Sequence, residues 1–130
     1  MAEGPGRILL VDDEPALLKM LEAYLVRLGH SVTATDTSAK ARMEVERAPG
    51  EFAVAVLDAS LPGEGLHSLA MSMLMASPAL HVLAASGYPV DMTALEAVAP
   101  GRVAFLHKPF SPQMLADIVR RMLGAQEEDL

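Results

Sequence analysis

The chain has no cysteine and no tryptophan, and only 4% of its 130 residues are aromatic. Without cysteine it can form no disulfide, no thiolate metal site and no cysteine nucleophile. Basic residues are also few: ten Lys and Arg stand against 17 Asp and Glu, for a formal charge of −7. Because nucleic-acid phosphates and anionic membranes are normally bound by basic patches, we expect no direct contact with either. A cation or a basic partner fits this charge better.

Long hydrophobic runs are missing as well. No stretch approaches the roughly 20 apolar residues of a membrane span, and residues 1–6 do not resemble the start of a signal peptide. We therefore expect a soluble, cytoplasmic protein. Hydrophobic residues nevertheless make up 52% of the chain and are spread along it, which is enough to give one domain its own core. We expect this domain to span residues 7–124, with residues 1–6 disordered and residues 125–130 forming an acidic tail.

Short apolar runs alternate with longer segments of helical period, which is typical of parallel strands joined by crossover helices. The five strands are predicted at Ile8–Val11, Ser31–Ala34, Ala53–Leu57, His81–Ala85 and Val103–Leu106. The first, third and fourth are almost continuously apolar, as strands covered on both faces are, and should be central. The sequence thus predicts an α/β protein: a doubly wound, five-stranded parallel sheet with helices on both faces.

Residues with known preferences for helix ends mark where the helices begin and stop. Pro15 suits the first position of a helix, and Gly29 is predicted to be the C-cap of that helix. Ser111, followed by Pro112, is predicted to cap the last helix. The helices between them are expected to open at Thr37 or Ser38, and to span Gly65–Met75 and Val90–Val98.

Polar side chains follow four of the predicted strands. Asp12 and Asp13 come after the first strand, Asp58 after the third, Ser86 after the fourth and Lys108 after the fifth. Because ligands bind at the carboxyl ends of the strands in such sheets, we expect these side chains to converge at one rim. Three carboxylates in one crevice repel one another, and a cation would offset that cost.

Oxygen-only ligands indicate magnesium, which is commonly held by one or two carboxylates while a phosphate completes its shell. Asp13 and Asp58 are predicted to supply those carboxylates. A phosphoryl group near Asp58 would need its remaining oxygens neutralised, and the ammonium of Lys108 and the hydroxyl of Ser86 suit that task. Since aspartate forms acyl phosphates when a metal screens the incoming charge, Asp58 is the predicted phosphoacceptor.

Taken together, these motifs resemble the receiver domain of bacterial two-component response regulators over nearly the whole chain. The matching segments are Ile8–Pro15, Val56–Asp58 with Leu61–Gly63, Ala84–Gly87 and Ala104–Phe110. The resemblance implies a flavodoxin-like (βα)5 fold of three layers with strand order 2-1-3-4-5. It also implies a signalling switch rather than an enzyme, with Mg²⁺ or Mn²⁺ as its cofactor.

By this resemblance, Asp58 takes a phosphoryl group from the phosphohistidine of a sensor or hybrid histidine kinase, or from a phosphotransfer protein. The metal is bound by Asp13, Asp58 and the backbone carbonyl of Ser60, while Asp12 acts through metal-bound water. The Lys108-Pro109 peptide bond resembles the cis peptide of the family.

The resemblance also implies a conformational switch. Lys108 pairs with the phosphoryl oxygens, Ser86 swings in to donate a hydrogen bond, and Phe105 turns into the space that Ser86 vacates. The face formed by the fourth helix, fifth strand and fifth helix then changes shape and meets an unidentified downstream protein. The unphosphorylated chain is expected to be a monomer, with a dimer on phosphorylation as an alternative.

The chain departs from the family pattern at two places. The segment Gly63-Glu64-Gly65, which follows Pro62, is about one residue shorter than is common, so the start of the third helix is expected to shift. Ser86 stands where Thr is at least as frequent, which keeps the hydroxyl group.

The same residues bear on three other functions. A phosphatase that forms an aspartyl-phosphate normally has a second Asp two positions after its nucleophile, where this chain has Ser60. A nucleotide or flavin binder needs a first turn rich in Gly, Ser or Thr, whereas Asp12-Asp13-Glu14 repels phosphate. A receiver-like interaction module that is never phosphorylated stays open, although such modules usually lose acidic or Lys positions that are retained here.

Overall fold

The computed structural model describes residues 6–128 of the chain, and the side chains of residues 6–124. The disorder predicted for residues 1–6 therefore falls outside the described residues except for Gly6. Within these residues, ten elements alternate strictly between strand and helix. They are β1 (Arg7–Val11), α1 (Pro15–Arg27), β2 (Val32–Thr35), α2 (Ser38–Arg47), β3 (Phe52–Asp58), α3 (Leu66–Ala76), β4 (His81–Ser86), α4 (Thr93–Val98), β5 (Val103–His107) and α5 (Pro112–Glu128).

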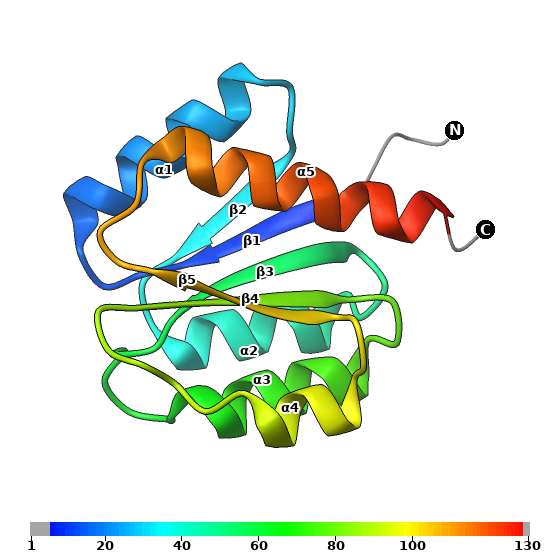
Figure 1. Cartoon of the computed structure of the whole chain (residues 1–130). Helices are drawn as coiled ribbons and strands as arrows, with labels where there is room; N and C mark the ends of the chain where they lie inside the picture. The colour runs from blue at the N-terminus through cyan, green and yellow to red at the C-terminus, as the bar shows by residue number, and fades with distance from the viewer. Residues whose placement is uncertain (1–5, 129–130) are drawn as a thin grey trace.

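All five strands form one parallel sheet in the order β2-β1-β3-β4-β5. This confirms the predicted flavodoxin-like topology, including the central position of the three most apolar strands. Figure 1 shows α1 and α5 on one face of the sheet and α2, α3 and α4 on the other. No helix in the described part of the chain is long and apolar enough to cross a bilayer.

The alternation of side chains along each strand divides the core into two halves. In β1, Leu9 and Val11 face α2, α3 and α4, whereas Ile8 and Leu10 face α1 and α5. All four side chains are buried, because a parallel sheet covered on both faces leaves neither side of its central strands in water. The sequence pattern of continuous apolar residues has this origin.

A side-chain cap is present at two of the predicted helix starts, at Thr37, which was one of two alternatives for the second helix, and at the predicted N-cap Ser111. The side chain of Thr37 accepts a hydrogen bond from the backbone N–H of Lys40 at the start of α2, and Ser111 Oγ accepts one from Met114 at the start of α5. Such caps satisfy backbone donors that the first turn leaves without a partner. Gly29 has φ +99° and lies one residue beyond the C-cap, which is Leu28. The predicted cap was thus wrong by one position, since glycine favours the left-handed residue that follows the cap.

Two helices differ from the prediction in length. The fourth helix begins at Thr93 and not at Val90, because the carboxylate of Asp91 accepts the N–H of Thr93 and closes a turn before the helix starts. The last helix continues through Glu128, so residues 125–128 are helical where an acidic tail was predicted. Ala, Gln and Glu, which occupy these positions, all have high helix propensity.

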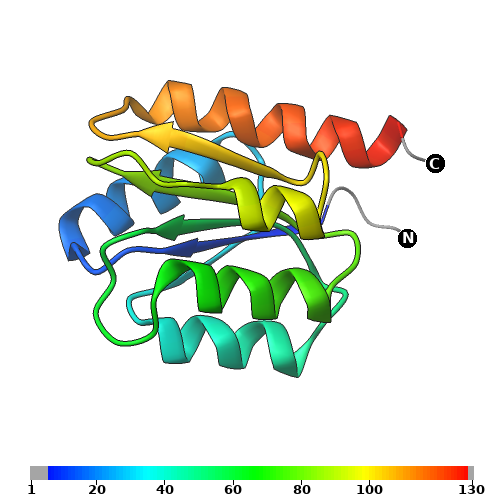
Figure 2. The same ribbon diagram turned by 60° about the horizontal axis from the view of Figure 1, so that its bottom comes forward.

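The fold gathers the polar residues at the edge of the sheet where the strands end. The strands run in the same direction (Figure 2), so the loops after β1, β3, β4 and β5 gather at a single edge. The polar residues singled out in the sequence lie in these loops or at the strand ends next to them.

Candidate functional site

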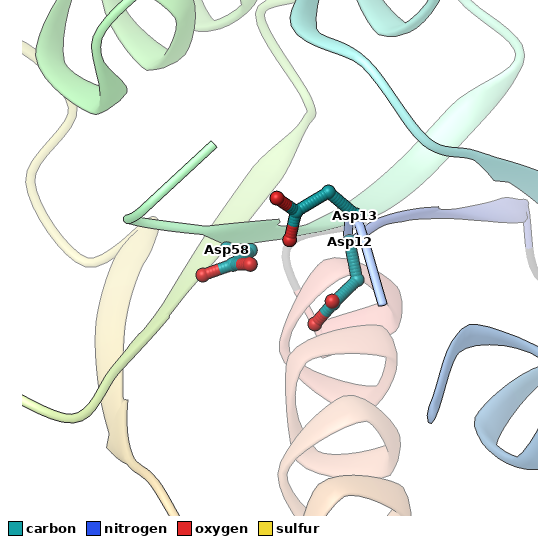
Figure 3. Close-up of side chains that lie close together, drawn as sticks. All are labelled: Asp12, Asp13 and Asp58. Carbon is teal, nitrogen blue, oxygen red and sulfur yellow. The ribbon is translucent and has the colours of Figure 1, made fainter. Parts of the chain in front are cut away.

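Three carboxylates meet where β1 and β3 end (Figure 3). Asp12, Asp13 and Asp58 each offer an oxygen atom, and these atoms all lie within 4.8 Å of one another. Asp58 is only 3% exposed and Asp12 6% exposed, whereas Asp13 is open to solvent. The predicted convergence of these carboxylates is confirmed. Such a group of hard oxygen donors is suited to a divalent cation such as Mg²⁺.

One ammonium group faces the carboxylates. Lys108 Nζ lies 3.3 Å from Asp12 Oδ2 and 3.4 Å from Asp58 Oδ1. The backbone N–H of Lys108 donates a 2.8 Å hydrogen bond to the carbonyl of Ser86, which fixes the residue beside the end of β4. The Lys108-Pro109 bond is cis, as the family resemblance implied. The fifth strand therefore brings its cation to the same edge as the three acids.

Burial and like charge make this pocket costly for the folded protein. Burial raises the pKa of Asp12, and the charge of Asp58 raises it further, while the backbone N–H of Glu14 and the ammonium of Lys108 act in the opposite direction. Burial also works against the charged form of Lys108, yet Asp12 and Asp58 outweigh it and raise the pKa of Lys108. One ammonium among three carboxylates leaves an excess of negative charge that a divalent cation would offset.

The carboxylate of Asp58 is held through one of its oxygens. Oδ1 accepts a 3.0 Å hydrogen bond from the backbone N–H of Ser60 and a 2.9 Å hydrogen bond from the Ser60 hydroxyl, and the same atom lies next to Lys108. Among residues 6–124, whose side chains are described, none donates a hydrogen bond to Oδ2. The N–H of Ala59 donates to the carbonyl of Ala85 at 2.8 Å and ties the loop after β3 to β4. The protein thus fixes the orientation of the carboxylate and leaves one oxygen open.

The side chains of the two predicted switch residues, Ser86 and Phe105, have partners outside the acidic cluster. Ser86 is buried at the end of β4, and its hydroxyl oxygen accepts a 3.0 Å hydrogen bond from the N–H of Tyr88. Within the described residues, its side chain bonds to neither Asp58 nor Lys108. Phe105 is half-buried on β5, packs against the core beneath α2, α3 and α4, and meets the His107 ring edge-on at 6.3 Å.

Sequence reasoning missed several contacts inside the site, among them the two hydrogen bonds from Ser60 to Asp58 and one that orients Asp12. The backbone N–H of Glu14 donates a 2.9 Å hydrogen bond to Asp12 Oδ1 and so orients that carboxylate. An aspartate that bonds to the N–H two residues ahead is a common turn. The signal was therefore available in the position of Asp12 just after a strand and just before a helix, although many other aspartates share it.

Comparison with known proteins decides the family. The family described as "Response regulator receiver domain" matches residues 8–120. The chain belongs to this family. The receiver domain is a module of two-component systems, and the acidic cluster, Ser86 and Lys108 of this receiver domain lie within or between the segments on which the resemblance was based.

Curated relatives are much longer proteins. Response regulator protein FleR of Pseudomonas aeruginosa is 35% identical over 128 residues, which cover 95% of this chain and 27% of FleR. Sensor kinase CckA of Brucella abortus is 30% identical over 124 residues, which cover 95% of this chain and 13% of CckA. The receiver domain thus spans a small part of relatives whose names include both a regulator and a kinase.

Solved structures agree with the fold. A CheY-like receiver domain protein from Methanospirillum hungatei superposes with a TM-score of 0.86 at 24% identity, covering 98% of this chain and 100% of that one. The receiver domain of the hybrid histidine kinase CckA has a TM-score of 0.78 at 26% identity, covering 91% of this chain and 99% of that one.

Proposed function

We propose that Asp58 of this receiver domain accepts a phosphoryl group from the phosphohistidine of a histidine kinase or a phosphotransfer protein. One observation carries the proposal: a buried carboxylate lies among two further carboxylates and one ammonium at the carboxyl ends of the strands. A structural ion pair needs only one acid for each base. The additional carboxylates are explained if they bind a divalent cation that lets a phosphoryl group enter the same pocket.

The residues present fit a bound Mg²⁺ or Mn²⁺. Asp13, Asp58 and the backbone carbonyl of Ser60 would hold the ion, with Asp12 acting through water. The donors are all oxygens, and the raised pKa of Asp12 reflects the desolvation and repulsion that a divalent charge would relieve. When bound, the ion screens the negative charge between Asp58 and the incoming phosphoryl group.

The chain's own residues then divide the work of transfer. Ser60 and Lys108 orient the carboxylate through Oδ1, and Oδ2 of Asp58 forms the new bond to phosphorus as the bond from phosphorus to the histidine nitrogen breaks. The electron pair of that bond returns to the imidazole, which leaves. Lys108 neutralises phosphoryl oxygen charge, and the Ser86 hydroxyl donates a hydrogen bond to it.

Transfer replaces a singly charged carboxylate with an acyl phosphate of about −2 charge. Lys108 and Ser86 follow this charge, and Phe105 moves into the space that Ser86 leaves. The face made of α4, β5 and α5 shifts toward a second arrangement that a downstream protein or a second copy recognises. In energetic terms this is a change in the populations of two packings, since the phosphoryl group interacts more favourably with one of them.

The test is chemical labelling. Acetyl phosphate with Mg²⁺ should add one phosphoryl group by intact mass, and hydroxylamine should remove it because the bond is an acyl phosphate. The variant Asp58→Asn, which keeps the shape of the side chain, should remain unlabelled. Beryllofluoride with Mg²⁺ should shift the amide resonances of α4, β5 and α5 in the wild type alone. A wild-type protein that neither takes label nor responds to beryllofluoride would be the receiver-like interaction module instead.

A further inference from the structure

A second polar network ties the far end of the β3–α3 loop to two helices. The guanidinium of Arg42, on α2, pairs with the carboxylate of Glu64 through two of its nitrogens: Nε donates to Oε1 at 3.1 Å, and Nη2 contacts Oε2. Ser68, on α3, donates to the same carboxylate at 2.6 Å, and Ser38 donates to the backbone carbonyl of Glu64 at 3.2 Å. Arg42 also donates to the Ser72 hydroxyl at 2.6 Å.

This loop, residues 59–65, carries the proposed metal ligand Ser60. The start of the loop is fixed by the bond from Ala59 to Ala85 and by the two bonds from Ser60 to the phosphoacceptor. The middle contains an exposed Gly63 with φ +90°, a conformation that glycine adopts readily and that adds little order by itself. Glu64 closes the loop, so its partners determine where the chain must return after Ser60.

The network differs from an isolated surface ion pair in its geometry and partial burial. The side chains of Arg42 and Glu64 are 33% and 22% exposed, and two-pronged pairing fixes the relative orientation of the two groups. The hydrogen bonds from Arg42 and then Ser68 hold the pKa of Glu64 below its ordinary value. Glu46, one turn further along α2, approaches Arg42 at 3.6 Å but does not belong to the loop.

We propose that Arg42 and Glu64 are positioning residues that hold the β3–α3 loop in the path that presents the backbone carbonyl of Ser60 to the metal. This inference rests on the proposed function. Neither side chain reaches the acidic cluster, so their effect passes through the backbone of residues 60–64. A loop that is ordered before the metal arrives loses less conformational entropy on binding, and the metal binds more tightly as a result.

The experiment measures the affinity of the full chain for Mn²⁺ by electron paramagnetic resonance, and for Mg²⁺ by calorimetry. Glu64→Gln is compared with Glu46→Gln, since both remove one carboxylate charge beside Arg42 and only Glu64 lies in the loop. We expect Glu64→Gln to weaken metal binding about 5- to 10-fold, near the lower end of what outer-shell partners contribute, and Glu46→Gln to leave it within about 2-fold.

Arg42→Met separates positioning from charge. Removing a positive charge should strengthen cation binding if only electrostatics matters, whereas loss of the tie should weaken it by about the same factor as Glu64→Gln. Arg42→Lys retains the charge without the two-pronged geometry, and should weaken metal binding by a smaller factor. This variant keeps the proposal testable if Arg42→Met does not fold. Melting temperatures and circular dichroism verify that each variant is folded.

The possible results separate the two proposals. Weaker binding by both Glu64→Gln and an Arg42 variant supports the positioning role. Tighter or unchanged binding by the Arg42 variants, or equal losses for Glu64→Gln and Glu46→Gln, overturns it while the phosphoacceptor proposal stands. A wild-type chain that binds neither metal overturns the proposed function first, and the positioning role with it.

Discussion

The ammonium of Lys108 lies 3.4 Å from Oδ1 of Asp58 although the strands that carry them, β5 and β3, are separated in the sheet by β4. The lysine reaches across the end of β4, where Ser86 is buried and where its carbonyl accepts the N–H of Lys108. A single side chain therefore connects the edge strand of the sheet to the buried carboxylate at its centre. This arrangement makes the charge of Lys108 the first quantity to test.

Replacing Lys108 with Met should change metal binding and phosphorylation in opposite directions. Loss of the ammonium removes a positive charge from the pocket, so Mg²⁺ affinity should rise about 3- to 10-fold at low ionic strength. Labelling by acetyl phosphate should slow by at least about 10-fold, because the phosphoryl oxygens lose their charged partner. Calorimetry with Mg²⁺ and the rate of mass increase measure the two effects separately.

The matched control is Lys40→Met. Lys40 is an exposed lysine on α2 whose ammonium pairs with Asp36 at 3.0 Å, so its replacement removes the same charge away from the acidic cluster. Neither metal affinity nor labelling should change by more than about 2-fold, since exposed charges at a distance are screened. Equal effects of the two replacements would mean that only the net charge of the protein matters.

Asp12→Asn should stabilise the metal-free protein at neutral pH. Burial, followed by repulsion from Asp58, raises the pKa of Asp12 in the folded state. The stability that protonated Asp12 contributes is present below its ordinary pKa of 3.8 and is lost as the pH rises through the raised value. Asparagine does not ionise, so the variant keeps this stability at neutral pH, and its side-chain oxygen can still accept the hydrogen bond from the N–H of Glu14. In the presence of a chelator, we expect the variant to melt at least about 3 °C higher than the wild type.

The gain from Asp12→Asn should shrink on either of two changes. It should diminish at acidic pH, where the Asp12 carboxyl of the wild type is itself protonated and neutral. It should also diminish at saturating Mg²⁺, where the bound ion offsets the repulsion between the carboxylates of the wild type. Differential scanning calorimetry across pH, with and without Mg²⁺, distinguishes these cases. A variant that is less stable than the wild type under all conditions would show that the contact with Lys108 outweighs the cost of burial.

Glu64→Gln should alter the acid limb of the stability curve. Because hydrogen bonds from Arg42 and then Ser68 lower the pKa of Glu64 in the folded state, its contribution is present above its ordinary pKa of 4.5 and disappears as the pH falls through the lowered value. We expect the variant to lose about 1 kcal/mol of unfolding free energy at neutral pH and almost none in strong acid. Urea unfolding at a series of pH values measures this, and a constant difference would contradict it.

Leu57→Ala tests the packing directly beneath Asp58, the proposed phosphoacceptor. Leu57 is fully buried in β3 and belongs to the core under α2, α3 and α4, so its truncation should cost about 2–5 kcal/mol. Leu28→Ala is the control at an exposed leucine and should cost less than about 0.5 kcal/mol. Chemical unfolding supplies both values, and similar losses at the two positions would argue against the buried placement of Leu57.

Much of this architecture could be predicted because it depends on local pattern. Continuous apolar runs identified the central strands, and a side-chain oxygen at Thr37 or Ser111 identified a helix start that the structure confirms. The order of acidic, hydroxyl and basic residues after successive strands predicted that they would meet, since parallel strands end at one edge. The roles assigned to these residues stay predictions for the experiments above.

The features that could not be predicted depend on a local turn that competes with a helix start, or on contacts between residues far apart in the sequence. Val90 carries no sign that the Asp91 side chain will close a turn and delay α4 until Thr93. The pair formed by Arg42 and Glu64 joins positions from different elements, and either charge taken alone resembles an ordinary surface residue. Neither the periodicity nor the motifs of the chain encode which distant ions will face each other.

The hydrogen bond from the Tyr88 N–H to the Ser86 hydroxyl oxygen links a side chain to the main chain two residues ahead. If the hydroxyl rotates toward Asp58, that bond must break or the peptide unit of Tyr88 must travel with it. In either case the connection leading into α4 is disturbed before any side chain of the helix is touched. The effect of phosphorylation would thus leave the pocket through the polypeptide backbone and reach the surface at Tyr88, a residue that is 77% exposed.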